Sequence, residues 1–183
     1  MSMPAVFLDR DGTIIEDTGY PGDSSPIHFL PGAPEALRKL QKQFLLIIIS
    51  NQSGVGRGFI TLDEMHRVHN KILIELAKET IEITDSYICP HAPSENCECR
   101  KPNSKMLINA AEKWEINLSQ SYMIGDKLSD TLAGNRAGCK SILLDQKIAP
   151  DQIREESHFP DYTAPDLNSA AEWIINDLKK NKS

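Results

Sequence analysis

The sequence lacks a hydrophobic run long enough to cross a lipid bilayer. Its longest uninterrupted apolar segment extends only from Phe44 to Ile49, whereas a membrane-spanning helix needs about 20 apolar residues. The first residues, Met1 to Pro4, contain neither a basic segment nor a small-residue cleavage site, so no secretory signal is recognisable. We therefore expect a cytoplasmic protein without a membrane partner.

Acidic residues outnumber basic residues. The chain has 20 Lys and Arg against 26 Asp and Glu, which gives a formal net charge of −6. An acidic chain has no general attraction for the phosphate backbone, so we expect no nucleic-acid partner. The 40% apolar and 25% charged residues are ordinary for a globular protein. A chain of this length can bury a full core without disulfides, and we expect a single domain over residues 1–183 that acts as a monomer.

Cysteine is also rare, and its placement does not suit a disulfide framework. Three of the four cysteines are Cys89, Cys97 and Cys99, and His91 lies among them. Three thiolates and one imidazole are the ligand set of a closed tetrahedral Zn²⁺ site. The alternative is a group of buried cysteines beside a surface histidine, but the residues between His91 and Cys97 show no apolar pattern that would bury them. We predict a structural zinc ion.

Short apolar runs alternate with longer amphipathic segments along the chain. The apolar runs predict five buried strands, at Ala5–Leu8, Phe44–Ile49, Ile83–Cys89, Tyr122–Ile124 and Ser141–Leu144. Helical spacing predicts five helices, at Ala33–Gln43, Thr61–Thr80, Ser104–Trp114, Ser129–Ala137 and Asp166–Lys180. This alternation predicts an α/β fold with a doubly wound, five-stranded parallel sheet of the Rossmann type. Ligands then bind beyond the carboxyl ends of the strands.

Acidic residues stand where the first and fourth predicted strands end. Asp9 and Asp11 follow the first strand and Asp126 follows the fourth. Two neighbouring carboxylates can divide labour, with Asp9 as nucleophile and Asp11 as general acid and base, although solvated acids in a turn would give the same pattern. Asp9, the backbone carbonyl of Asp11 and Asp126 would form a Mg²⁺ site. Asp130 suits either an outer position in that site or an acid favoured by a helix N-terminus.

Polar and basic residues follow the second and third strands. Glycines within Ser50–Gly58 would let backbone N–H groups approach an anion closely. Ser50 would hold a phosphoryl oxygen, and Lys101 would stabilise the charge of a phosphoryl transition state. Arg100 and Lys101 directly follow the last cysteine of the cluster, so a zinc-bound loop would fix both cations beside the phosphate. Each residue alone is unremarkable, but their order places all of them at one edge of the sheet.

This order resembles the haloacid dehalogenase-like phosphohydrolase superfamily over nearly the whole chain. The matching motifs are Asp9–Thr13, Ser50, Lys101 and Gly125–Asp130. The resemblance implies an aspartyl-phosphate intermediate on Asp9, proton transfer by Asp11, and Mg²⁺ held by Asp9, Asp11 and Asp126. No insertion large enough for a mobile cap domain is visible, so a capless phosphatase is expected.

Within the superfamily, the zinc motif followed by Arg100, Lys101 and Pro102 resembles the branch of the heptose bisphosphate phosphatases and histidinol-phosphate phosphatases. The segments Ser50–Phe59 and Tyr122–Asp130 favour the heptose enzymes, whereas the short gap between His91 and Cys97 is similar to the histidinol phosphatases. The expected substrate is therefore a phosphorylated sugar, with histidinol phosphate as the alternative. The resemblance also implies a role in making nucleotide-activated heptose for lipopolysaccharide or another glycan.

The resemblance further implies a set of substrate-binding residues. They are Asp17, Thr18, Gly19, Tyr20, Ser50, Asn51, Gln52, Ser53, Arg57, Arg100, Lys101 and Lys127. Arg57 and Arg100 are candidates for a second, distal phosphate because guanidinium groups bind phosphate in a bidentate manner. For Arg57, an unengaged surface position in a glycine loop is an equal alternative.

Two other classes of protein remain as alternatives. A receiver domain of a signalling system also has a parallel sheet, acidic residues, a phosphorylated aspartate and a lysine. Its phosphorylated acid follows the third strand, however, where this chain has Cys89-Pro90-His91. A zinc-stabilised nucleic-acid-binding module would carry a helix rich in Lys and Arg beside the zinc motif, and none is evident here.

Overall fold

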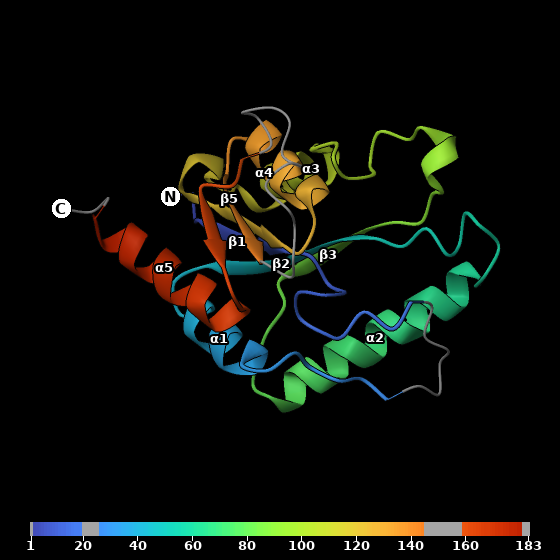
Figure 1. The fold of residues 1–183 in the computed structure, drawn as a ribbon, viewed down its shortest axis with the longest axis horizontal. Coiled ribbons are helices and arrows are strands. Elements are labelled where there is room, and N and C mark those ends of the chain that lie inside the picture. The colour runs from blue at the N-terminus through green and yellow to red at the C-terminus, as the bar shows by residue number, and fades with distance from the viewer. Residues whose placement is uncertain (1, 20–25, 145–158, 181–183) are drawn as a thin grey trace.

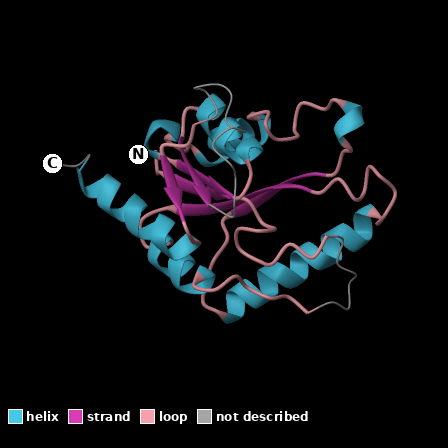
Figure 2. Cartoon of the chain, viewed as in Figure 1, coloured by secondary structure: helices cyan, strands magenta, loops and turns pink. Residues whose placement is uncertain are grey.

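A parallel β-sheet forms the centre of the fold (Figure 1; Figure 2). The computed structural model describes residues 2–19, 26–144 and 159–180. Within these ranges the sheet has six strands in the order β3-β2-β1-β4-β5-β6, and every neighbouring pair is parallel. The strands are β1 (Ala5–Leu8), β2 (Leu45–Asn51), β3 (Asp85–Cys89), β4 (Tyr122–Gly125), β5 (Lys140–Leu144) and β6 (Tyr162–Ala164).

The predicted number of five strands was wrong, because β6 adds a sixth at one edge. β6 has only three residues, and it pairs with β5 through Ile142↔Tyr162 and Leu144↔Ala164. Only Ala164 in this strand is fully buried. A strand so short gives no apolar run or alternation in the sequence, so pairing with β5 is what defines it.

Helices cover both faces of the sheet (Figure 1). One face carries α1 (Ala33–Leu40), α2 (Leu62–Lys78) and α5 (Leu167–Lys180), and the other carries α3 (Lys105–Trp114) and α4 (Leu128–Ala137). Two short 3₁₀ helices, η1 (Pro93–Glu95) and η2 (Leu118–Gln120), lie in connections. The five predicted helices and five predicted strands are all present, with ends within three residues of those expected. The doubly wound α/β fold is thereby confirmed.

The central strand β1 shows how the sequence divides between the two layers. Val6 and Leu8 belong to the apolar cluster beneath α1, α2 and α5. Ala5 and Phe7 belong to the cluster beneath α3 and α4. All four side chains are completely buried. Because side chains alternate across a strand, a strand buried on both faces needs a continuous apolar sequence, and β1 has one.

The helix ends follow from local sequence signals. The Thr61 hydroxyl accepts a hydrogen bond from the Glu64 amide, and the Glu64 carboxylate accepts one from the Thr61 amide, so a capping box begins α2. Gly138 ends α4 with a φ of 87°, a left-handed conformation that favours glycine. Ser104 occupies the N-cap position of α3, but its side chain makes no capping hydrogen bond.

The helices in the described ranges include none that is both long and apolar enough to cross a membrane.

Candidate active site

The carboxyl ends of four neighbouring strands bring the predicted catalytic side chains together. Asp9 follows β1, and its amide donates a hydrogen bond to the carbonyl of Ile124 in β4. Ser50 lies at the end of β2, Lys101 follows β3 and Asp126 follows β4. A cavity of about 390 Å³ opens at this edge of the sheet. It is lined by Asp9, Asp11, Asp17, Gly19, Asn51, Gln52, Ser53, Arg100, Lys101, Lys127, Ser129 and Asp130.

Lys101 is the buried cation of this site. Its Nζ lies 2.7 Å from Asp9 Oδ1 and 2.7 Å from Asp130 Oδ1, and it donates a third hydrogen bond of 2.7 Å to the Ile49 carbonyl. Burial acts to lower the pKa of Lys101, but the negative charges of Asp130 and Asp9 outweigh it and raise the pKa. Lys101 therefore stays protonated and fixes the direction of the Asp9 carboxylate.

Three carboxylates converge beside this lysine. Asp9, Asp126 and Asp130 each place an oxygen within 4.8 Å of the others. Burial and the neighbouring acids raise the pKa of Asp126 to about 7, and burial raises the pKa of Asp130 to about 6 although Lys101 opposes it. The Asp126 Oδ1 atom is buried and has no hydrogen-bond partner. Hard oxygen ligands, clustered charge and an unpartnered carboxylate oxygen fit a divalent cation such as Mg²⁺.

Gly12 leaves the space that this cluster needs. It adopts a φ of +82°, and a Cβ atom built on it would lie 2.5 Å from Asp126 Oδ2. Any side chain at position 12 would therefore displace Asp126 from the carboxylate cluster.

The three predicted magnesium ligands do not all lie in the cluster through their side chains. Asp9 and Asp126 do, but the third side chain is that of Asp130. The Asp11 carboxylate instead accepts hydrogen bonds from Arg10 and Gln52. Because the Asp11 carboxylate is engaged there, the backbone carbonyl of Asp11 remains as the predicted magnesium ligand. Asp130 lies closer to the ion site than the sequence indicated, and it also accepts a hydrogen bond from the Lys127 amide at the start of α4.

We expect Mg²⁺ to stabilise the protein more at pH 8 than at pH 5. The folded-state pKa values of Asp126 and Asp130 are raised above the ordinary value of 3.8. Their contribution to stability is therefore fully present below pH 4 and is lost as pH rises through about 7. Mg²⁺ replaces the lost protons and restores that stability. The melting temperature measured with and without Mg²⁺ tests this, with Asp126→Asn as control. An equal Mg²⁺ shift at both pH values would contradict it.

Two amide side chains from the end of β2 organise the site. Asn51 was predicted to bind substrate, but its amide nitrogen donates to the Lys101 carbonyl and its oxygen accepts from the Lys101 amide, both at 3.0 Å. Asn51 thus also fixes the segment that carries the lysine. Gln52 Nε2 donates to Asp11 Oδ2 at 2.6 Å and to Ser50 Oγ at 2.8 Å. The sequence showed neither the pairing of Asn51 with Lys101 nor that of Gln52 with Asp11, since each joins residues from different segments.

The predicted cations are divided between the cavity and the surface. Arg100 lines the cavity and donates through Nη1 to the His91 carbonyl at 3.3 Å. Lys127 also lines it, with Nζ 3.6 Å from Asp17 Oδ2. Arg57 is exposed and does not line the cavity, and neither does Thr18. Tyr20 lies outside the described residues.

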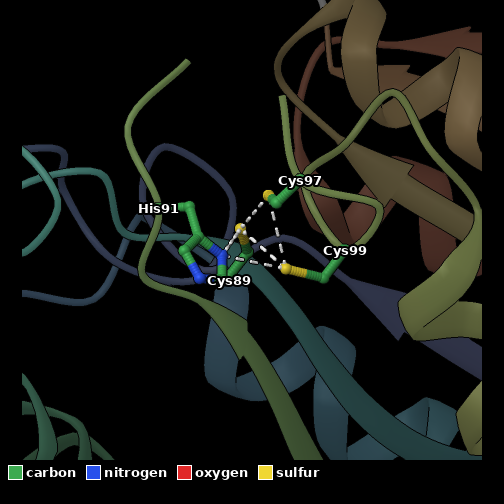
Figure 3. Close-up of side chains that lie close together, drawn as sticks. All are labelled: Cys89, His91, Cys97 and Cys99. Carbon is green, nitrogen blue, oxygen red and sulfur yellow. Dashed lines mark hydrogen bonds between the residues drawn. The ribbon is translucent and has the colours of Figure 1, made fainter. Parts of the chain in front are cut away.

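The cysteine cluster closes around one point beyond β3 (Figure 3). Cys99 Sγ lies 3.1 Å from Cys89 Sγ and 3.5 Å from Cys97 Sγ, and His91 Nδ1 lies 3.3 Å from Cys99 Sγ. All four ligand atoms lie within 4.8 Å of one another. Zinc–sulfur bonds of about 2.3 Å in a tetrahedron separate the ligands by roughly 3.8 Å. The side chains therefore fit the predicted structural Zn²⁺ ion.

Comparison with known proteins agrees with this geometry. A family model described as HAD-hydrolase-like matches residues 98–170. The D-glycero-beta-D-manno-heptose-1,7-bisphosphate 7-phosphatase of Escherichia coli K12 is 34% identical over 185 residues, covering 97% of this chain and 91% of the relative. This chain belongs to the heptose bisphosphate phosphatase family of haloacid dehalogenase-like hydrolases. The Helicobacter pylori member is 42% identical over 142 residues, which cover 76% of this chain and 82% of the relative.

Solved structures of the family share the fold over almost the full length. The D,D-heptose 1,7-bisphosphate phosphatase of B. bronchiseptica superposes with a TM-score of 0.82 at 28% identity, covering 96% of this chain and 99% of that one. That structure contains magnesium and phosphate. The Burkholderia thailandensis enzyme has a TM-score of 0.68 at 26% identity. The acidic cluster of this chain therefore suits the Mg²⁺-dependent phosphatase reaction of the family.

Sequence reasoning missed two residues of the site. Arg10 is almost fully buried and pairs with Asp11, although an arginine between two acids suggests a solvated turn. Ser129 lines the cavity from the first turn of α4. A serine at a helix N-terminus gives no signal that separates a ligand contact from an ordinary helix start.

Proposed function

We propose that this protein hydrolyses the 7-phosphate of D-glycero-D-manno-heptose 1,7-bisphosphate and releases heptose 1-phosphate and inorganic phosphate. The observation that carries the proposal is the convergence of Asp9, Lys101 and Asp126 in a chain that matches phosphatases named for this reaction over almost their full length. The cavity beside these residues holds further cations, which a substrate with two phosphates requires.

In the first step, an oxygen of the Asp9 carboxylate attacks the phosphorus of the 7-phosphate. The bond between phosphorus and the C7 oxygen of the sugar breaks, and the phosphoryl group becomes an aspartyl phosphate on Asp9. The protonated carboxyl group of Asp11 gives its proton to the departing alkoxide. Burial raises the pKa of Asp11 although the Arg10 charge opposes it, which favours the proton-carrying form.

In the second step, a water molecule attacks the phosphorus of the aspartyl phosphate. The Asp11 carboxylate now accepts the proton of that water, the bond between Asp9 and phosphorus breaks, and inorganic phosphate leaves. When bound, Mg²⁺ neutralises charge on the phosphoryl oxygens and on the carboxylates of Asp9 and Asp126. Lys101 Nζ, already 2.7 Å from Asp9 Oδ1, adds a fixed positive charge beside this carboxylate.

The remaining polar groups of the cavity bind the substrate. Ser53, Asp17 and Gly19 line the cavity, and the buried Ser50 hydroxyl, which accepts a hydrogen bond from Gln52, is the further candidate for the phosphoryl group. Arg100 and Lys127 supply the positive charge for the distal 1-phosphate. A guanidinium group forms two parallel hydrogen bonds with phosphate, so Arg100 is the stronger candidate.

Replacing Arg100 by Ala should separate the two phosphates of the substrate. The change removes a contact with the distal phosphate but leaves Asp9, Asp11 and Lys101 in place. We expect kcat/KM for the heptose bisphosphate to fall by about 10- to 100-fold, and kcat/KM for 4-nitrophenyl phosphate to change by less than about 3-fold. Arg38→Ala, which removes a surface arginine from α1, is the matched control. Equal losses for both substrates would make Arg100 a ligand of the transferred phosphate instead.

Histidinol phosphate is the second candidate substrate, because only five residues separate His91 from Cys97. Phosphate release from both anomers of the heptose bisphosphate and from histidinol phosphate should be measured side by side with Mg²⁺. Preference for one heptose anomer, ending after one phosphate per sugar, supports the proposal. Preference for histidinol phosphate overturns the substrate assignment. Release of one phosphate per chain and then nothing would indicate a receiver domain.

The same proposal includes the setting of the reaction. We place it in the cytoplasm, in the assembly of nucleotide-activated heptose for lipopolysaccharide or another glycan. The chain acts there as one capless domain and as a monomer. Sedimentation of the active protein tests the oligomeric state, and a dimer mass would contradict it.

A further inference from the structure

Arg10 stands next to the site but takes no part in the chemistry described above. We propose that Arg10 positions the carboxyl group of Asp11 for proton transfer, and this inference rests on the proposed function. Arg10 is not among the residues that line the cavity, and its guanidinium group is hydrogen-bonded to the Asp11 carboxylate, so we infer that it acts through this neighbour. Its side chain is 2% exposed, which is unusual for an arginine.

The guanidinium group of Arg10 forms a fork with the Asp11 carboxylate. Nε donates to Oδ2 at 3.0 Å, and Nη2 donates to Oδ1 at 3.2 Å. Such two-point pairs fix both the distance and the plane of a carboxylate. Gln52 Nε2 donates to the same Oδ2 atom at 2.6 Å. Asp11 is thus held from two sides, while it still lines the cavity where a leaving oxygen would lie.

Among the described residues, Asp11 is the one carboxylate that forms an ion pair with Arg10. The Nη1 atom is buried without a hydrogen-bond partner, and so are both ring nitrogens of His69 in α2. Burial and the charge of Arg10 lower the pKa of His69 to about 4, so that imidazole is neutral near pH 7. The charge of Arg10 is therefore directed to Asp11.

A positioning role predicts a dependence on the leaving group. An alkyl phosphate needs its departing oxygen protonated, whereas 4-nitrophenolate leaves without help. We expect Arg10→Met to lower kcat/KM for the preferred alkyl phosphate by about 30- to 100-fold, and for 4-nitrophenyl phosphate by less than about 5-fold. Because kcat/KM covers only the steps up to transfer onto Asp9, it excludes the later attack of water. Arg10→Lys keeps the buried charge without the fork, and we expect it to recover only part of the loss.

A double-mutant cycle with Asp11→Asn isolates the coupling. If Arg10 acts through Asp11, Arg10→Met in the Asp11→Asn background should change kcat/KM for the alkyl phosphate by less than about 3-fold. Melting temperatures identify variants that fail to fold, in which case Arg10→Lys carries the test.

The two proposals fail in different ways. Equal losses for both leaving groups, or losses that multiply with those of Asp11→Asn, would overturn the role of Arg10 in an enzyme that otherwise works as proposed. A wild-type protein that turns over histidinol phosphate but not the heptose bisphosphate would overturn the substrate assignment. The Arg10 test would then use histidinol phosphate, which is also an alkyl phosphate.

Discussion

Replacing Asp9 by Asn is expected to lower kcat by at least about 10³-fold, because the amide cannot form the aspartyl phosphate. The side chain keeps nearly the same shape and stays 5% exposed beneath the cavity. Lys101 loses one of two buried carboxylate partners but keeps Asp130 at 2.7 Å. The fold should therefore survive, and the effect should fall on turnover. Steady-state phosphate release with Mg²⁺ is the measurement.

The matched control for this change is Asp63→Asn. Asp63 is an exposed acid in the first turn of α2, and it does not line the cavity. It should leave kcat unchanged. If Asp9→Asn keeps turnover near the wild-type value, the nucleophile is another group and the two-step mechanism is wrong. Wild-type protein mixed with ³²P-labelled substrate and quenched with acid should retain the label on the chain. Loss of that label in the variant would identify Asp9 as the phosphorylated residue.

The fold could be predicted because its strands carry strong local signals. The run Phe44–Ile49 has only one structural role, a strand buried on both faces, and β2 has that role. Thr61 and Glu64 form a capping box at the start of α2, which is a signal contained in four consecutive residues. The edge strand β6 was missed because pairing with β5, rather than composition, makes it a strand.

The sequence was enough to predict which loops meet at the candidate site, but not which atoms of those loops contact one another. Topology alone places Asp9, Lys101 and Asp126 at one edge of the sheet. Whether Lys101 meets Asp130 depends on side-chain directions that no sequence spacing encodes. The same holds for Arg10, whose burial and pairing with Asp11 follow from the packing of the folded chain rather than from its position in the sequence. Local sequence signals specify the helices and strands, whereas contacts between distant segments specify what each site residue does.

The loop that carries the cysteine cluster, residues 89–99, and the loop at the end of β2, residues 50–58, are joined by backbone hydrogen bonds. The Gln52 amide donates to the Cys89 carbonyl at 2.7 Å, and the Gly56 amide donates to the Pro90 carbonyl at 2.9 Å. A Cβ atom on Gly56 would lie 2.3 Å from the Ala92 nitrogen, so the two loops touch without room for a side chain. Order in one loop therefore requires order in the other.

Removing one zinc ligand should consequently disable catalysis, although the ligand lies outside the cavity. We expect Cys99→Ser to abolish stoichiometric zinc, lower the melting temperature and reduce kcat/KM by at least about 100-fold, because metal binding supplies folding energy to this loop. Lys101 lies only two residues beyond Cys99, and the Arg100 side chain donates a hydrogen bond to the His91 carbonyl. Both cations would lose their fixed positions, which costs orientation at the phosphoryl group. Metal analysis and kinetics on the same preparation are the measurements.

Cys139→Ala is the control, because Cys139 is buried in the apolar cluster beneath α3 and α4 and lies outside the zinc cluster. It should keep one zinc ion per chain and near-normal kcat/KM. A wild-type protein purified without chelator that holds no zinc would refute the metal site itself. A Cys99→Ser variant that loses zinc yet keeps full activity would refute only the coupling, since the contacts of Gln52 and Gly56 would then suffice to hold the catalytic loops.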